Sequence, residues 1–185
     1  VYESFGQALR MAFVQGTSIM TTTGFVTADF DLWPNASRIL LVLLMFIGGC
    51  AGSTGGGIKV VRVAIVLKKV RRELRRFVRP QAVLALKLGG KPVDQSIVSH
   101  IAAFFIMFIL LFAVITLTMT FFTPDVETAF TAVIATMGNI GPGLAAVGAT
   151  QNYADIPAVG KAILTFCMLL GRLELYTVLI VLLPS

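Results

Sequence analysis

The chain has 185 residues, of which 57% are hydrophobic and only 13% are charged, and its formal net charge is +6. Soluble domains carry about 25% charged residues, and the mean hydropathy of this chain is +0.90. These values exclude an ordinary soluble domain and predict an integral membrane protein, because much of the chain must lie in a bilayer.

The basic residues are concentrated in segment 59–91. It holds eleven of the fifteen Lys and Arg residues: Lys59, Arg62, Lys68, Lys69, Arg71, Arg72, Arg75, Arg76, Arg79, Lys87 and Lys91. The loops expected outside hold the acidic residues Asp29, Asp31, Asp125, Glu127 and Asp155. This split follows the positive-inside rule and predicts a multi-pass protein with 59–91 in the cytoplasm. Spanning segments on both sides favour contact with anionic lipid headgroups over nucleic-acid binding.

The first predicted element is a short helix. Ser4–Gln7 fits a capping box, and the pattern from Ala8 to Met20 is helical. A span needs about 20 residues, so this helix is expected to re-enter the membrane, where it must be buried in protein or line a water-filled cavity. Thr21–Phe25 follows, with a glycine that adopts positive φ without steric cost. The segment is either a helix-ending glycine or an extended stretch whose carbonyls replace the water shell of a potassium ion.

A spanning helix is then expected to break within the membrane. Trp33 is an interfacial anchor, Pro34 marks a helix start, and the apolar run Ile39–Ile47 begins a span. Gly48–Gly57 contains six glycines in ten residues, each of which costs a helix about 1 kcal/mol relative to alanine. The remaining expected elements, in order, are a basic amphipathic helix (58–78), a linker (80–92), an uncharged full span (96–122), a short helix begun by Thr123 and Pro124 and ending near Met137, a glycine segment (138–143), a loop, and a last span (157–183).

The chain contains an internal repeat. An offset of 117 aligns Gly24 with Gly141, and an offset of 123 aligns Pro34 with Pro157. Each unit is a short helix, a glycine segment, a loop and a spanning helix. Two such segments favour one site built from several copies, and the partial negative charge at the C-terminal end of each short helix suits a cation.

Arg172 and Glu174 interrupt the last span. An ionisable residue inside a membrane is a functional hypothesis by default. The pair either stabilises helix packing alone or contributes to a gate. Arg172 aligns with Gly49 in the glycine break, and a cation below a carbonyl filter would repel a passing cation.

Other site chemistries are not supported. Gly52–Gly57 resembles a phosphate-binding loop, but Ile58 occupies the position of its lysine. Cys50, Cys167 and His100 have no metal-ligand spacing, and no disulfide is indicated. We find no catalytic constellation and therefore expect neither an enzyme nor a cofactor. The chain begins with Val1, which suggests a piece of a longer polypeptide.

Five stretches together resemble the Trk/Ktr/HKT superfamily of potassium transporters, most closely its bacterial TrkH/TrkG type: Thr21–Phe25, Gly48–Lys59, Lys87–Gly90, Asn139–Gly143 and Gly171–Glu174. The resemblance covers essentially the whole chain. It implies an all-α membrane fold of M1–P–M2 repeats, four per pore, with re-entrant pore helices. Residues 1–92 would be the pore helix, filter, broken M2 and basic linker of the third repeat, and 93–185 the complete fourth, about one and two-thirds repeats.

The resemblance also implies the site residues and partners. The filter would comprise Thr22, Thr23, Gly24, Phe25, Asn139, Ile140, Gly141 and Pro142, with K⁺ held by the backbone carbonyls of Thr22, Thr23, Asn139 and Ile140. The gate would comprise Gly48, Gly49, Gly52, Ser53, Thr54, Gly55, Gly56 and Gly57, with Arg172 beside it. The ion is the transported substrate. The family implies a homodimer in the bacterial inner membrane, with a TrkA-like nucleotide-binding regulatory subunit.

The expected function is therefore gated potassium uptake. Sodium or non-selective cation permeation stays open, because half of the filter would lie outside this chain. A membrane scaffold that docks cytosolic partners through segment 59–91, without transport, is the alternative from another class.

Overall fold

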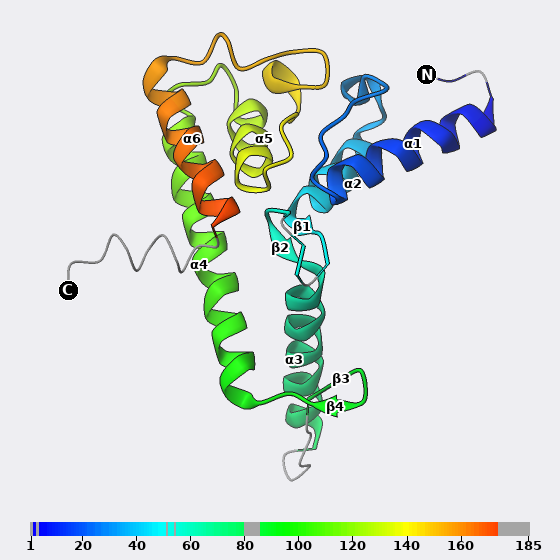
Figure 1. The fold of residues 1–185 in the computed structure, drawn as a ribbon, viewed down its shortest axis with the longest axis vertical. Helices are drawn as coiled ribbons and strands as arrows, with labels where there is room; N and C mark the ends of the chain where they lie inside the picture. Colours follow the sequence, from blue (N-terminus) through cyan, green and yellow to red (C-terminus); the bar gives the residue numbers. More distant parts are fainter. Residues whose placement is uncertain (1, 3, 51, 54, 80–85, 174–185) are drawn as a thin grey trace.

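The computed structural model describes residues 2, 4–50, 52–53, 55–79 and 86–173. In this part the chain is mostly helical, with helices α1 (Phe5–Met20), α2 (Asn35–Phe46), α3 (Val60–Val78), α4 (Gln95–Met119), α5 (Val126–Met137) and α6 (Ala158–Arg172). Short 3-10 turns, η1 (Phe30–Leu32) and η2 (Ala145–Val147), lie in the loops after α1 and α5. Helices α3 and α4 run side by side, whereas α1 extends away from them (Figure 1).

The two short helices begin at different kinds of cap. The hydroxyl of Ser4 accepts a hydrogen bond from the Gln7 N–H at 3.2 Å, which confirms the predicted cap of α1. Helix α5 does not begin at Thr123 and Pro124, as expected. Its N-cap is Asp125, whose carboxylate accepts from the Thr128 N–H at 2.7 Å. A carboxylate caps better because it also carries the charge that a helix N-terminus favours.

The all-α expectation is incomplete at the glycine break. There β1 (Ile47–Gly48) pairs in parallel with β2 (Ile58–Lys59). Helix α3 therefore begins at Val60 and not at Ile58 as expected. A helix that breaks leaves backbone groups without partners, and the two strands satisfy part of that requirement by pairing with each other.

The segment expected to be a linker contains a hairpin. Strand β3 (Lys87–Leu88) pairs antiparallel with β4 (Lys91–Pro92). The two residues between them, Gly89 and Gly90, have φ values of +56° and +82°, the left-handed pair that a tight two-residue turn requires. The hairpin connects α3 to α4 at the lower end of Figure 1.

One helix in the described part of the chain is long and apolar enough to cross a membrane. This is α4, with 25 residues and a mean hydropathy of 2.8 in its most apolar window. It extends about 37 Å at 1.5 Å per residue. Helices α2 and α5 are also apolar but have 12 residues each. Helix α6 is described as far as Arg172, so Glu174 and the expected end of the last span lie outside the described residues.

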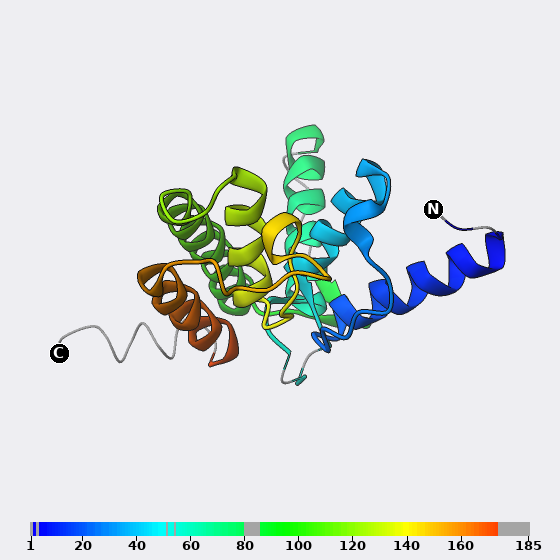
Figure 2. The ribbon, with the colours of Figure 1, turned by 90° about the horizontal axis from the view of Figure 1, so that it is seen from above.

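Helix α5 lies at the centre of the core. Nine of its twelve residues are buried, and it packs against α4 and α6 (Figure 2). Phe130 of α5 meets Phe112 of α4 edge-to-face, with ring centroids 4.9 Å apart, and Phe46 of α2 meets Phe112 at 5.1 Å. Such pairs contribute about 0.5–1.5 kcal/mol each beyond area burial. The cluster joins the two repeat units, because Phe46 belongs to the first and Phe112 and Phe130 to the second.

Candidate functional site

The glycine segments that follow α1 and α5 share one backbone conformation. Thr22 and Asn139 both lie in the left-handed region, with φ values of 55° and 53°, and Gly24 and Gly141 follow with +75° and +109°. A left-handed conformation costs a residue with a side chain about 1–2 kcal/mol. The same strained conformation at positions that the repeat aligns indicates one local design used twice.

The backbone hydrogen bonds of the two segments also match residue for residue. The Thr23 N–H donates to the Ser18 carbonyl at 2.9 Å, and the Ile140 N–H donates to the Ala135 carbonyl at 2.8 Å. Each bond reaches back five residues, which closes the helix end as in a Schellman cap. Within the described residues, no donor is recorded for the backbone oxygens of Thr22, Thr23, Asn139 and Ile140.

The two segments lie against each other. A Cβ atom added to Gly24 would overlap the carbonyl oxygen of Ile140 and would lie 3.4 Å from Cδ of Pro142. Only glycine allows this approach. The structure thus brings the two sequence-predicted segments together, with one carbonyl of the second facing the glycine of the first.

A side-chain hydroxyl donates to one carbonyl of each segment. Ser18 Oγ donates to the Phe25 carbonyl, and Tyr153 Oη donates to the Gly141 carbonyl, both at 2.7 Å. Burial raises the pKa of Tyr153, so its hydroxyl remains a donor. Sequence reasoning missed both residues. Ser18 could have been suspected from its place in the last turn of α1, whereas the loop that holds Tyr153 contains the six-residue insertion and has no aligned counterpart.

The two ends of the glycine segment 48–57 are held beside each other by the pairing of β1 with β2. A Cβ at Gly48 would overlap the Gly56 carbonyl oxygen. The Gly55 N–H donates to Ser53 Oγ at 3.1 Å, and Gly52 has a φ of +85°. Thr54, which was assigned to the gate, lies outside the described residues.

Arg172 lines a small cavity of about 60 Å³ beside this loop. Two further cations line it, Lys59 and Arg62, and the Arg62 guanidinium carbon lies 4.2 Å from the centroid of the Phe104 ring. Sequence reasoning assigned both cations to the cytoplasmic cluster. Their positions two and five residues after Gly57, the last residue of the glycine break, were the signal that they border the site.

A charged network joins the loops on the far side of the segments. Asp31 accepts from the Ala145 N–H at 3.1 Å and lies 3.5 Å from Arg38, which also pairs with Glu127. Burial raises the pKa of Asp31 above its ordinary value. The hydrogen bond from the Ala145 N–H and the charge of Arg38 act in the opposite direction but do not cancel the effect of burial. Sequence reasoning treated Asp31 and Glu127 only as outer-loop charges. Arg38 and Glu127 are 89 positions apart, so no local sequence pattern indicated that they would pair.

Short helices that end in matching, touching glycine segments next to a glycine loop are features of a helical cation transport protein. Comparison with known proteins agrees with this class. The family model described as "TrkH: Cation transport protein" matches residues 3–185, and the chain belongs to this family. The resemblance found in the sequence is thereby confirmed.

Curated relatives cover the whole chain. It is 42% identical over 184 residues to the Trk system potassium uptake protein TrkH of Halomonas elongata, covering 100% of this chain and 38% of that protein. It is 32% identical over 180 residues to TrkG of Escherichia coli, covering 97% of this chain and 36% of that protein. The crystal structure of the potassium transporter TrkH from Vibrio parahaemolyticus matches with a TM-score of 0.89 and 42% identity, over 99% of this chain and 39% of that one. The chain thus spans less than two-fifths of the length of these relatives.

Proposed function

We propose that this chain supplies two segments of a potassium-selective filter in a membrane potassium uptake protein. One observation carries the proposal: segments 22–25 and 139–142 repeat the same strained backbone and meet at Gly24 and Ile140. The relatives that match the whole chain bear the name of potassium uptake proteins.

The ion ligands in this proposal are the backbone carbonyls of Thr22, Thr23, Asn139 and Ile140. A carbonyl without an N–H donor keeps its lone pairs for a cation, and rings of such carbonyls replace the hydration shell of K⁺. Helices α1 and α5 end at these segments, and the partial negative charge of a helix C-terminus favours a cation there. Phe25 and Pro142 close the segments on the outer side.

The gate in this proposal is the loop 48–57 together with Arg172. The loop lies against both filter segments, and Arg172 lines the cavity beside it. A guanidinium near the ion path raises the energy of a passing cation, and a glycine-rich backbone can change conformation with little steric cost. Displacement of the loop would then open the path.

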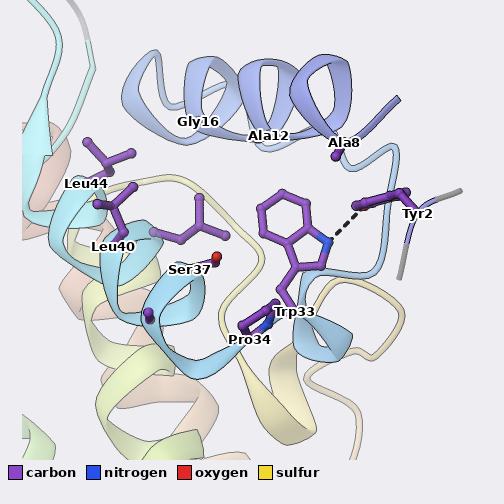
Figure 3. Close-up of a pocket in the computed structure, with 11 residues that line it drawn as sticks. Tyr2, Ala8, Ala12, Gly16, Trp33, Pro34, Ser37, Leu40 and Leu44 are labelled. Carbon is purple, nitrogen blue, oxygen red and sulfur yellow. Dashed lines mark hydrogen bonds between the residues drawn. The ribbon is translucent and has the colours of Figure 1, made fainter. Parts of the chain in front are cut away.

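The proposed architecture is the M1–P–M2 repeat, with α2 and α3 as the two parts of a broken M2 in 1–92 and with 93–185 as the fourth repeat. A cavity of about 600 Å³ between α1 and α2 supports it. Figure 3 shows Ala8, Ala12 and Gly16 of α1 along one side, and Trp33, whose indole N–H donates to Tyr2 Oη at 2.8 Å. In the second repeat unit α4 occupies the place that corresponds to this cavity. The repeat aligns Gly160 with Ser37, which lines the cavity, and a Cβ at Gly160 would lie 3.4 Å from the side chain of Met119 in α4.

The proposed setting is the bacterial inner membrane, with several spans and with segment 59–91 in the cytoplasm. Helix α3 carries basic side chains along its length, which suits anionic lipids at the inner surface. The proposed assembly is a homodimer that binds a TrkA-like regulatory subunit; the Trk system name of the relatives supports such a partner.

The test is ion uptake by the full-length protein in liposomes. We expect K⁺ uptake to exceed Na⁺ uptake at equal concentrations, and we expect Gly141→Ser to lower this ratio because φ at Gly141 is +109°. Equal uptake of both ions by the unaltered protein would replace the proposal with a non-selective cation pathway. No uptake of either ion would favour the scaffold.

A further inference from the structure

The glycine loop touches the filter at two equivalent positions. A Cβ at Gly55 would lie 3.1 Å from Oγ1 of Thr22, and a Cβ at Gly56 would lie 2.9 Å from Nδ2 of Asn139. Thr22 and Asn139 are the left-handed residues that the repeat aligns. Two adjacent loop residues thus each contact the corresponding side chain of one filter segment.

Asn139 also connects the filter to the helix that carries Arg172. Its side-chain N–H donates to the Met168 carbonyl of α6 at 3.2 Å, one helical turn before Arg172. A Cβ at Gly171 would lie 2.8 Å from the same nitrogen and would overlap the Met137 carbonyl oxygen. The amide therefore lies between the loop, α6 and the end of α5.

These contacts involve residues whose backbone conformation is energetically unfavourable. Asn139 and Thr22 hold left-handed φ values that the surrounding structure must maintain. These two residues, together with Thr23 and Ile140 that follow them, carry the proposed ion ligands. If the loop moves away, each left-handed residue loses a contact that fixes it, and the adjacent carbonyls change direction.

We propose that Thr22 and Asn139 are positioning residues that couple the glycine loop to the filter. Displacement of the loop then alters the ion preference of the filter as well as the flux. This inference rests on the proposed function and deepens it, because a gate that only obstructs the path would change the flux of every ion equally.

The first test substitutes each left-handed residue by glycine in the full-length protein, with K⁺ and Na⁺ uptake measured in liposomes. Glycine retains the backbone conformation and removes the side chain, which for Asn139 means both the contact with the loop and the hydrogen bond to the Met168 carbonyl. We expect Asn139→Gly to lower the K⁺/Na⁺ ratio about fivefold, the effect of one ordinary hydrogen bond, and Thr22→Gly to lower it in the same direction. Ala145→Gly is the matched control, because Ala145 has a φ of 55° but lies in the turn η2. An Asn139→Gly ratio equal to that of the control would overturn the proposal, since a merely structural role would scale both fluxes together.

A second test does not depend on which ion passes. In the full-length protein with Cys50 and Cys167 replaced by alanine, Thr22→Cys and Gly55→Cys are introduced together, at a contact short enough for a disulfide. We expect oxidation to link the pair, to lower total cation uptake severalfold and to be reversed by a reductant. Failure to link, or unchanged uptake once linked, would overturn the coupling. If the unaltered protein showed no preference for K⁺ over Na⁺, only the proposed function would be refuted. Total cation uptake before and after oxidation of the cysteine pair would still decide whether the loop and the filter move together.

Discussion

Gly24→Ala is the sharpest test of how closely the two filter segments fit. In the structure the new Cβ overlaps the Ile140 carbonyl oxygen, and the backbone φ is +75°. The left-handed conformation costs alanine about 1–2 kcal/mol. Relief of the overlap adds about 1–3 kcal/mol, because a backbone oxygen cannot rotate away as a side chain can. The substitution therefore costs about 2–5 kcal/mol, less than the stability of a typical fold.

Much of this cost should appear in ion selectivity, since the atom that must move is a proposed potassium ligand. A change of about 1.4 kcal/mol in the relative binding of two ions alters their ratio tenfold. We therefore expect Gly24→Ala to lower the K⁺/Na⁺ uptake ratio of the full-length protein at least about tenfold. The matched control is Gly6→Ala, because Gly6 lies in α1, the helix that precedes Gly24, and an added Cβ there meets nothing within 4 Å.

The assay is uptake of each ion into liposomes, with thermal unfolding of the same samples. An unchanged ratio for Gly24→Ala would refute the assignment of this contact to the filter. Equal losses for Gly24→Ala and Gly6→Ala would refute the argument that the overlap with Ile140 is the cause.

Three further predictions concern charged residues. Arg172→Ala should raise basal K⁺ uptake about tenfold, because two like unit charges separated by about 10 Å repel each other by about 1.7 kcal/mol at an effective dielectric constant of about 20; unchanged or lower uptake would contradict a blocking role. Arg38→Met should lower the free energy of unfolding by about 1–2 kcal/mol through loss of the links to Asp31 and Glu127, measured by chemical unfolding in detergent; an unaltered midpoint would show that the network contributes no stability. Burial raises the pKa of Asp31 above its ordinary 3.8 in the folded protein, so its contribution to stability is full below that value and is lost as the pH rises through the folded pKa. Asp31→Asn should therefore gain in unfolding temperature relative to the parent protein between about pH 4 and pH 7, and a difference that shrinks with rising pH would reverse the assigned sign.

Features with a local signal could be predicted from the sequence. The Ser4 cap depends on residues three positions apart, and the positive φ at Gly24 and Gly141 follows from the residue type at a helix end. The repeat indicated two matching units, and in the structure their glycine segments share a conformation because the same short pattern meets the same capping requirement twice. The family itself was also recognised from these stretches.

Features that depend on distant contacts could not be predicted. The pairing of β1 with β2 joins residues across a glycine-rich stretch that lacks strand propensity. The ion pair of Arg38 and Glu127 requires the first turns of α2 and α5 to meet in space. The start of α5 was misplaced because Asp125 outcompetes Thr123 as a cap, although both types are common there. Each failure is a case of tertiary structure or local competition overriding a pattern.

The pairing of β1 with β2 has a mechanical consequence for any movement of the loop 48–57. The pair fixes the entrance and the exit of the loop beside each other, at the junction of α2 and α3. A displacement confined to the nine residues between the strands, 49–57, leaves the separation of these helices unchanged. Such a motion resembles the swing of a short Ω-loop more than the tilting of a span. The surrounding lipid would not need to rearrange, so the rate of opening would depend on the loop itself and little on bilayer thickness.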